Sequence, residues 1–188
     1  MRWKIRIDPF VYPLCAFLLL AVPLKALCGW FGAAVCHELG HIAAQYILGG
    51  RLGKIVVLPT GAVIEGEDLG VCKNVICVLA GPVMGAVPMI FMRLFPELAL
   101  FSFLLTAYNL IPLYPMDGGR VLHLMSERST LMQILVMAVE AAVTACLICM
   151  VFWCHTPVPL LPLIPFLREK YLAKRRNSEY NRATIEMR

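Results

Sequence analysis

Residues 35–41 read VCHELGH, an H-E-x-x-H pattern in an apolar stretch, and the rest of the chain is interpreted around them. We expect residues 27–48 to form one helix, in which His37 and His41 lie one turn apart and present both imidazoles on the same face. Two histidines that bind one zinc ion require this arrangement. The Glu38 side chain projects from the helix beside them, where it can act as a general base on a metal-bound water. Such a pentapeptide also arises by chance. Ionisable residues are costly inside a membrane, however, so their presence in an apolar helix indicates a function.

The composition predicts an integral membrane protein. The 188 residues are 60% hydrophobic and 15% charged, with a mean hydropathy of +0.77, against roughly 45–50% apolar and 25% charged residues in soluble domains. This excludes a soluble zinc peptidase. The net charge of +5 is explained by membrane orientation and contact with anionic lipid, so no nucleic-acid partner is expected.

The predicted fold is an all-α polytopic membrane protein with about six transmembrane helices. The expected spans are residues 10–25, 27–48, 74–91, 98–109 and the two arms of 131–167, which turn near residues 155–157. Between spans two and three, two short β-branched runs flank Pro59-Thr60-Gly61 and predict a short membrane-associated β-hairpin. We assign residues 1–167 to a transmembrane metalloprotease domain with its core at 27–122, and residues 168–188 to a basic cytoplasmic tail.

The charge distribution predicts the orientation of these spans. With six spans and a cytoplasmic N-terminus, every Lys and Arg residue except Lys25 and Arg93 lies on the cytoplasmic side. Without the sixth span, this asymmetry disappears. The histidine motif and the end of span four then both lie toward the cytoplasmic side.

Residues 109–120, NLIPLYPMDGGR, contain two prolines and a glycine pair that should break the helix. Unwound backbone at membrane depth is tolerated where it lines a cavity. A catalytic zinc site takes three protein ligands and leaves the fourth position for water. Asp117, at a depth similar to that of the histidines, is the candidate third ligand, although aspartate is also a common turn former in such a sequence.

These motifs together resemble the site-2 protease family of intramembrane zinc metalloproteases. The resemblance rests on HELGH at residues 37–41 and on NLIP at 109–112 followed by Met116-Asp117-Gly118, and it covers residues 27–122. The chain is most similar to the sporulation branch, which cleaves a membrane-tethered sigma-factor precursor, and we expect no C-terminal regulatory domain. Two positions depart from the family pattern: Met116 stands where leucine is usual, and Gly85 where asparagine is common.

The resemblance implies one Zn2+ per chain, held by His37, His41 and Asp117. Glu38 would take the proton of the attacking water and pass it to the leaving amine. Asn109 would hydrogen-bond the substrate backbone or the developing oxyanion, unless it only caps its helix.

The hairpin is similar to a membrane-embedded β-element of the family. Its edge, at Ile55, Val56 and Val57, would hold an unwound substrate as an added strand.

The predicted function is that of an intramembrane zinc metalloendopeptidase, which hydrolyses a peptide bond in or near a transmembrane segment of a membrane-tethered protein. We expect a multi-pass protein of the bacterial cytoplasmic membrane, with its active site toward the cytoplasm and a membrane regulatory partner. The alternative is a membrane protein that binds zinc without proteolysis. A zinc carrier should place further ligands along its spans, whereas these spans offer only Glu140.

Overall fold

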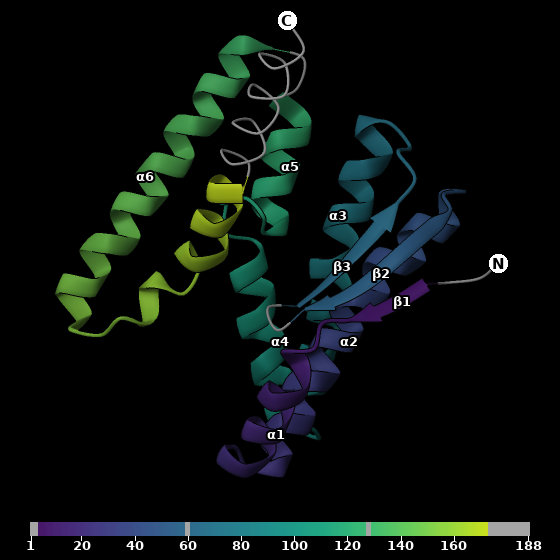
Figure 1. Cartoon of the computed structure of the whole chain (residues 1–188), viewed down its shortest axis with the longest axis vertical. Coiled ribbons are helices and arrows are strands. Elements are labelled where there is room, and N and C mark those ends of the chain that lie inside the picture. The colour runs from purple at the N-terminus through teal and green to yellow at the C-terminus, as the bar shows by residue number, and fades with distance from the viewer. Residues whose placement is uncertain (1–3, 59–60, 127–128, 173–188) are drawn as a thin grey trace, which may run out of the picture. The chain divides into compact units, whose positions relative to one another are not determined.

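The computed structural model describes residues 4–58, 61–126 and 129–172, and the chain forms two compact units, Met1–Leu110 and Ile111–Arg188 (Figure 1). The predicted turn residues 59–60, and the tail from residue 173 onward, lie outside the described residues.

The helices of the first unit follow the predicted spans with shifted ends. They are α1 (Val11–Ala21), α2 (Leu24–Ile47), α3 (Val71–Ala86), the 3-10 turn η1 (Val87–Phe91) and α4 (Pro96–Asn109). α1 ends at Val22, which is extended because the residue before a proline is disfavoured in the helical conformation. Pro23 then caps α2.

The three strands of the first unit confirm the predicted hairpin and add a strand that the sequence analysis missed. β2 (Leu52–Leu58) and β3 (Gly61–Gly66) pair antiparallel, and β1 (Lys4–Ile7) pairs with β2 in parallel. β2 is therefore the central strand, and β1 and β3 are the edges. β1 has only four residues and includes basic ones, so its sequence showed no recognisable strand pattern.

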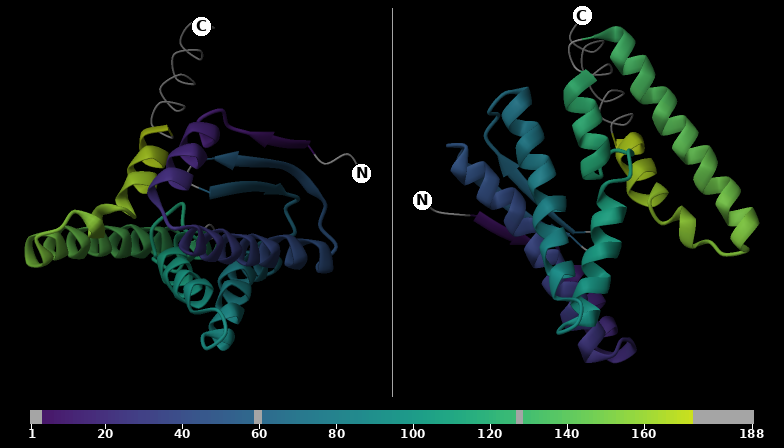
Figure 2. Two further views of the ribbon diagram at one scale, coloured as in Figure 1. Left: turned by 90° about the horizontal axis from the view of Figure 1, so that it is seen from below. Right: turned by 180° about the vertical axis from the view of Figure 1, so that it is seen from behind.

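Small residues let α2 pack closely on its helical neighbours. In Figure 2 (left) the sheet lies on one side of α2, while α3 and α4 lie on the other. A Cβ added at Gly40 would overlap the Ala80 carbonyl of α3, and one at Gly29 would lie 2.9 Å from the Glu97 backbone of α4. Glycine at these two positions therefore permits the close contact between helices.

The second unit contains α5 (Asp117–Ser126), α6 (Thr130–Cys154), the 3-10 turn η2 (Val158–Leu160) and a helical segment over residues 163–172. The predicted turn near residue 155 is confirmed, because His155 has a left-handed φ of 52° that ends α6. The prediction of a continuous break over residues 109–120 is wrong at its end. Asp117 starts a helix directly after the loop, and the glycine pair lies in its first turn.

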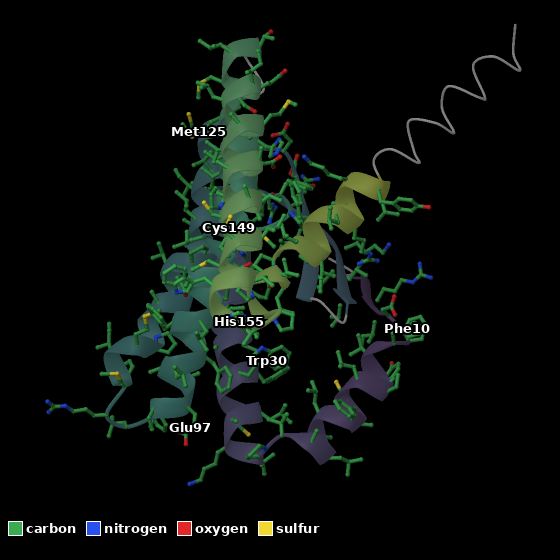
Figure 3. The ribbon with its side chains drawn as sticks, turned by 90° about the vertical axis from the view of Figure 1, so that its left-hand side faces the viewer. Phe10, Trp30, Glu97, Met125, Cys149 and His155 are labelled. Atoms are coloured by element: carbon green, nitrogen blue, oxygen red, sulfur yellow. The ribbon has the colours of Figure 1, made fainter. Side chains whose placement is uncertain are left out.

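Two of the described helices are long and apolar enough to cross a membrane: Val71–Phe91, with 21 residues, and Thr130–Val151, with 22. Only 11% of the second is buried within the chain, and its side chains project outward in Figure 3, where Cys149 is labelled. Burying such an apolar surface requires lipid or another protein. The six-span topology remains a prediction.

Candidate metal centre

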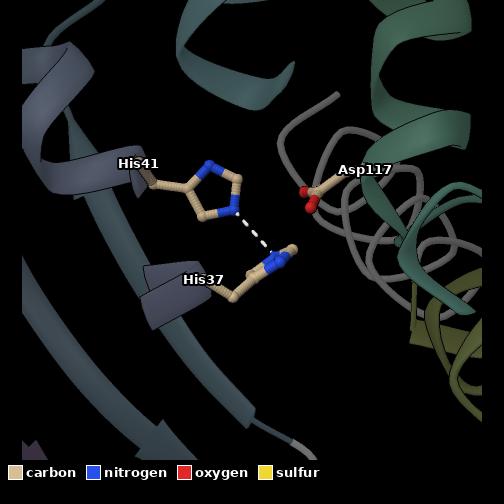
Figure 4. A group of neighbouring side chains, drawn as sticks. All are labelled: His37, His41 and Asp117. Atoms are coloured by element: carbon tan, nitrogen blue, oxygen red, sulfur yellow. Dashed lines mark hydrogen bonds between the residues drawn. The ribbon is translucent and has the colours of Figure 1, made fainter. Parts of the chain in front are cut away.

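His37 and His41 meet on one face of α2, as their spacing predicts. Their Nε2 atoms lie 3.2 Å apart, and the rings are nearly perpendicular, with an interplanar angle of 81° (Figure 4). His37 is buried and His41 is half-buried. Both ligand nitrogens therefore face one point.

The tautomer of His41 is fixed by a backbone group. Its Nδ1 lies 2.9 Å from the carbonyl oxygen of Cys77 on α3, which can only accept a hydrogen bond. Nδ1 must therefore carry the proton, which leaves the lone pair of Nε2 directed toward His37. Metal-ligating histidines are oriented in the same way, by donating their other N–H to a carbonyl or carboxylate.

The separation of the two nitrogens fits zinc. A tetrahedral ion with Zn–N distances of about 2.0–2.1 Å holds its nitrogens about 3.3 Å apart. The observed 3.2 Å needs almost no adjustment. The histidine pair is thus arranged as half of a tetrahedral site.

A glycine on α3 makes room for the His41 ring. A Cβ added at Gly81 would overlap that ring. A helix carrying any other residue at this position could not pack so closely against the histidine. The sequence analysis did not identify this contact.

The position at which the family commonly has asparagine lies beside His37. A Cβ at Gly85 would lie 3.2 Å from His37 Nδ1 and 3.1 Å from Thr106 Oγ1 of α4. Within the described part of the chain, the buried hydroxyls of Thr106 and Ser102 have no hydrogen-bond partner. α4 therefore brings the Thr106 hydroxyl near His37, a neighbour that the sequence analysis missed.

Glu38 follows His37 on α2 and is half-buried. Its place on the helix is the one predicted for the general base.

Asp117 is the first residue of α5 and belongs to the second unit. Its side chain is buried, and its Oδ1 accepts a hydrogen bond of 3.4 Å from Arg120 Nη1 one turn later. A carboxylate at a helix N-terminus is favoured by the helix dipole.

The remaining predicted residues have local partners. Asn109 ends α4, and its Nδ2 donates to the Leu105 carbonyl at 3.0 Å, as a residue that stabilises the helix end would. Ile55, Val56 and Val57 pair with β1 on one side and β3 on the other, so they do not form the open edge that was expected. The open edges belong to β1 and β3.

Residues 75–153 match peptidase family M50. Over 139 residues the chain is 27% identical to stage IV sporulation protein FB of Bacillus subtilis, covering 66% of this chain and 48% of that protein. It is 35% identical over 106 residues to a zinc metalloprotease of Methanocaldococcus jannaschii, covering 49% of this chain and 31% of that protein. The chain is thus similar to peptidase family M50 over residues 75–153 and to these two proteins over longer stretches.

The fold agrees with this family. A solved site-2 protease from Methanocaldococcus jannaschii superimposes with a TM-score of 0.65 at 20% identity, covering 89% of each chain. The similarity to the Bacillus subtilis protein supports the predicted sporulation-like branch. The chain spans about half or less of the length of the two relatives matched by sequence.

Proposed function

We propose that the chain is an intramembrane zinc metalloendopeptidase, which hydrolyses a peptide bond in or near a transmembrane segment of a membrane-tethered protein. The observation that carries the proposal is the pair of imidazoles on α2, with Nε2 atoms 3.2 Å apart and the His41 tautomer fixed by Cys77. The match of residues 75–153 to peptidase family M50 and the similarity to a zinc metalloprotease support it.

We assign one Zn2+ per chain to His37, His41 and Asp117. Two imidazole nitrogens and one carboxylate oxygen form a donor set typical of a catalytic zinc site. Zinc bound there would lower the pKa of its water and polarise the scissile carbonyl. A zinc ion held by these three residues would keep a fourth position for water and substrate.

The acid–base work is assigned to Glu38. Its carboxylate takes a proton from the attacking water and then delivers it to the leaving amine, as a general base and acid. Asn109 is assigned to the substrate backbone or the oxyanion. For that role its Nδ2 would use its second N–H, because only one is donated to the Leu105 carbonyl.

The substrate is proposed to unwind and add as a strand at an edge of the sheet. Because β2 is paired on both sides, Ile55, Val56 and Val57 would support this strand from the middle of the sheet. We assign the substrate to β3, which leads directly into α3, the helix beside the histidines. A photo-reactive residue at alternate positions of β3 should label a bound substrate. If substrate is labelled only by photo-reactive residues placed in β1, the substrate binds at the β1 edge instead.

The protein is proposed to be a multi-pass protein of the bacterial cytoplasmic membrane, with six spans and its active site toward the cytoplasm. The match to peptidase family M50 and the two long apolar helices support the membrane location. Residues 1–167 would form the protease domain around a core at 27–122, and residues 168–188 the cytoplasmic tail. A reporter fused after residue 95 should therefore lie outside the cell, and one fused after residue 172 inside.

The partners would be a membrane-tethered substrate, a membrane regulatory protein and the lipid bilayer. The basic residues are assigned to lipid contact and orientation, so no nucleic acid is included.

The deciding experiment compares wild type with Glu38→Gln on a membrane-tethered substrate, in detergent, with bound zinc quantified. We expect one zinc per chain in both proteins and a cleavage rate at least about a hundred-fold lower in the variant. If both proteins hold zinc and neither cleaves any of several substrates, the non-proteolytic zinc-binding protein replaces the protease.

A further inference from the structure

Glu140 is a buried carboxylate in the middle of the apolar helix α6. Its residue is 2% exposed, and its partners come from three other segments of the second unit. Oε1 accepts from His123 Nε2 at 2.9 Å and from the Tyr114 backbone N–H at 3.5 Å. Oε2 lies 3.3 Å from Lys170 Nζ. Burying a carboxylate is costly without such partners, so they account for its presence in the helix.

Two of these partners lie on either side of Asp117 in the sequence. Tyr114 precedes it in the loop after α4, and His123 follows it on α5. The Tyr114 and His123 rings also contact each other edge to face, with centroids 5.4 Å apart. A single carboxylate oxygen therefore holds both sides of the segment that carries Asp117.

A glycine brings this loop directly onto α5. A Cβ at Gly119 would overlap the backbone of Leu113 and Tyr114, and Leu113 is fully buried. The loop and the first turn of α5 thus form one packed piece. Displacing Tyr114 or His123 would therefore shift the carboxylate of Asp117 as well.

The second oxygen of Glu140 links this piece to the helical segment over residues 163–172. Lys170 Nζ also lies 4.5 Å from the centroid of the Phe166 ring, which is buried. Both oxygens therefore have partners, which fixes the rotation of the carboxylate about its last bond and with it the direction in which Oε1 faces.

We infer that Glu140 is a positioning residue, which sets the place of Asp117 as a zinc ligand through Tyr114 and His123. This inference rests on the proposed function, because it takes Asp117 as the third ligand. A role in folding alone would lower stability without changing which atoms hold the metal. The ligand set is therefore the quantity to measure.

The test replaces zinc with Co2+ in the purified full chain and records the visible absorption, which reports the number and geometry of the ligands. Zinc affinity is measured in parallel by competition with a chelator. The variants are Asp117→Ala, Glu140→Ala and Glu140→Gln. Val136→Ala is the matched control, because Val136 is buried on α6 one turn before Glu140.

Glu140→Ala should lower zinc affinity by about ten- to a hundred-fold, the usual effect of losing a group that orients a ligand. Its cobalt spectrum should shift toward that of Asp117→Ala. Glu140→Gln should restore part of the affinity and the spectrum, because its amide oxygen can still accept from His123 and Tyr114 while its NH2 group loses the contact with Lys170. Val136→Ala should lower thermal stability and leave the spectrum unchanged.

A wild-type spectrum and affinity in Glu140→Ala would overturn the inference, as would an equal spectral change in Val136→Ala. If Asp117→Ala itself leaves the spectrum unchanged, Asp117 is not a metal ligand, and the proposed ligand set and the inference are both wrong. If Glu140→Ala does not accumulate, His123→Ala decides in its place. The His123 side chain is 46% exposed, so its loss should be tolerated in folding, and a wild-type spectrum there would overturn the inference.

Discussion

The two units position their candidate zinc ligands by different physical means. In the first unit, His37 and His41 are set by close backbone contacts, since Gly40 and Gly81 leave no space for a side chain between α2 and α3. In the second unit, the segment that carries Asp117 is held by hydrogen bonds of Tyr114 and His123 to Glu140. Closely packed atoms cannot accommodate an added group without moving, whereas hydrogen-bonded side chains can shift and keep part of their contacts. Substitutions should therefore act abruptly at the histidines and gradually around the aspartate.

The largest effect is expected for Gly81→Ala. The added methyl group would overlap the His41 ring and push it out of line with His37, at a packing cost of about 1–3 kcal/mol. A displacement of about 1 Å at a catalytic group lowers activity by about a hundred-fold, and we expect at least that loss in cleavage. Gly32→Ala is the control, because its Cβ meets only the flexible end of Leu98 at 3.0 Å. Unchanged zinc affinity in Gly81→Ala would contradict the claim that close packing positions the histidines.

Gln45→Met tests whether a polar contact in the first unit also gives a graded effect. Gln45 is buried on α2, and its Nε2 donates to the Glu67 carbonyl at 2.9 Å. Methionine keeps the volume and leaves this carbonyl unpaired, so the free energy of unfolding should fall by about 1–3 kcal/mol. Chemical denaturation measures this change, and chelator competition should show an unaltered zinc affinity. A loss of zinc as large as that in Gly81→Ala would contradict the distinction.

Arg120→Gln should have a smaller effect on the second unit. Arg120 Nη1 lies 3.4 Å from Asp117 Oδ1, and the arginine side chain is 44% exposed. A solvated pair at this helical spacing contributes about 0.3–0.5 kcal/mol, so zinc affinity should change by no more than about two-fold. A change beyond about ten-fold would make Arg120 part of the machinery that positions Asp117.

The smallest effect is expected for Asp68→Asn, in the loop before α3. The Gly70 N–H and then the Asn74 amide lower the pKa of Asp68 below its ordinary value of 3.8. Because the folded-state pKa is the lower one, the charge stabilises the fold above the unfolded pKa. This contribution disappears as the pH falls through the folded-state pKa. The melting temperature of the variant should therefore be lower than that of wild type at neutral pH and equal to it in acid. A difference that persists in acid would indicate that the side-chain shape, and not the charge, causes the effect.

Local patterns predicted much of the first unit. The histidine spacing, the hairpin and the helix from about residue 27 all follow from signals within a few residues, and each appears in the structure. β1 was not predicted, because its partners on β2 lie fifty residues further along the chain, as in Lys4 with Lys54. That pairing also closes the edge of β2 to which the substrate had been assigned.

The second unit was predicted less well. Prolines and glycines indicated a break after Asn109, yet the same glycine pair lies inside α5, where Gly119 allows the loop to pack on the helix. The sequence analysis named Glu140 only as a further ligand within the spans, and no pattern indicated its partners. His123 and Lys170 approach it only once the chain has folded.

The sequence by itself determined the candidate chemistry: the two imidazoles, the glutamate between them, and an aspartate after a broken helix in an apolar chain. Helical periodicity fixes which neighbouring side chains share a face, so this much is local. Only the tertiary structure decided which group fixes the tautomer of His41, which strand is central and what anchors the Asp117 segment. These depend on backbone carbonyls, on glycine contacts and on buried pairs, which become neighbours only when distant segments pack together.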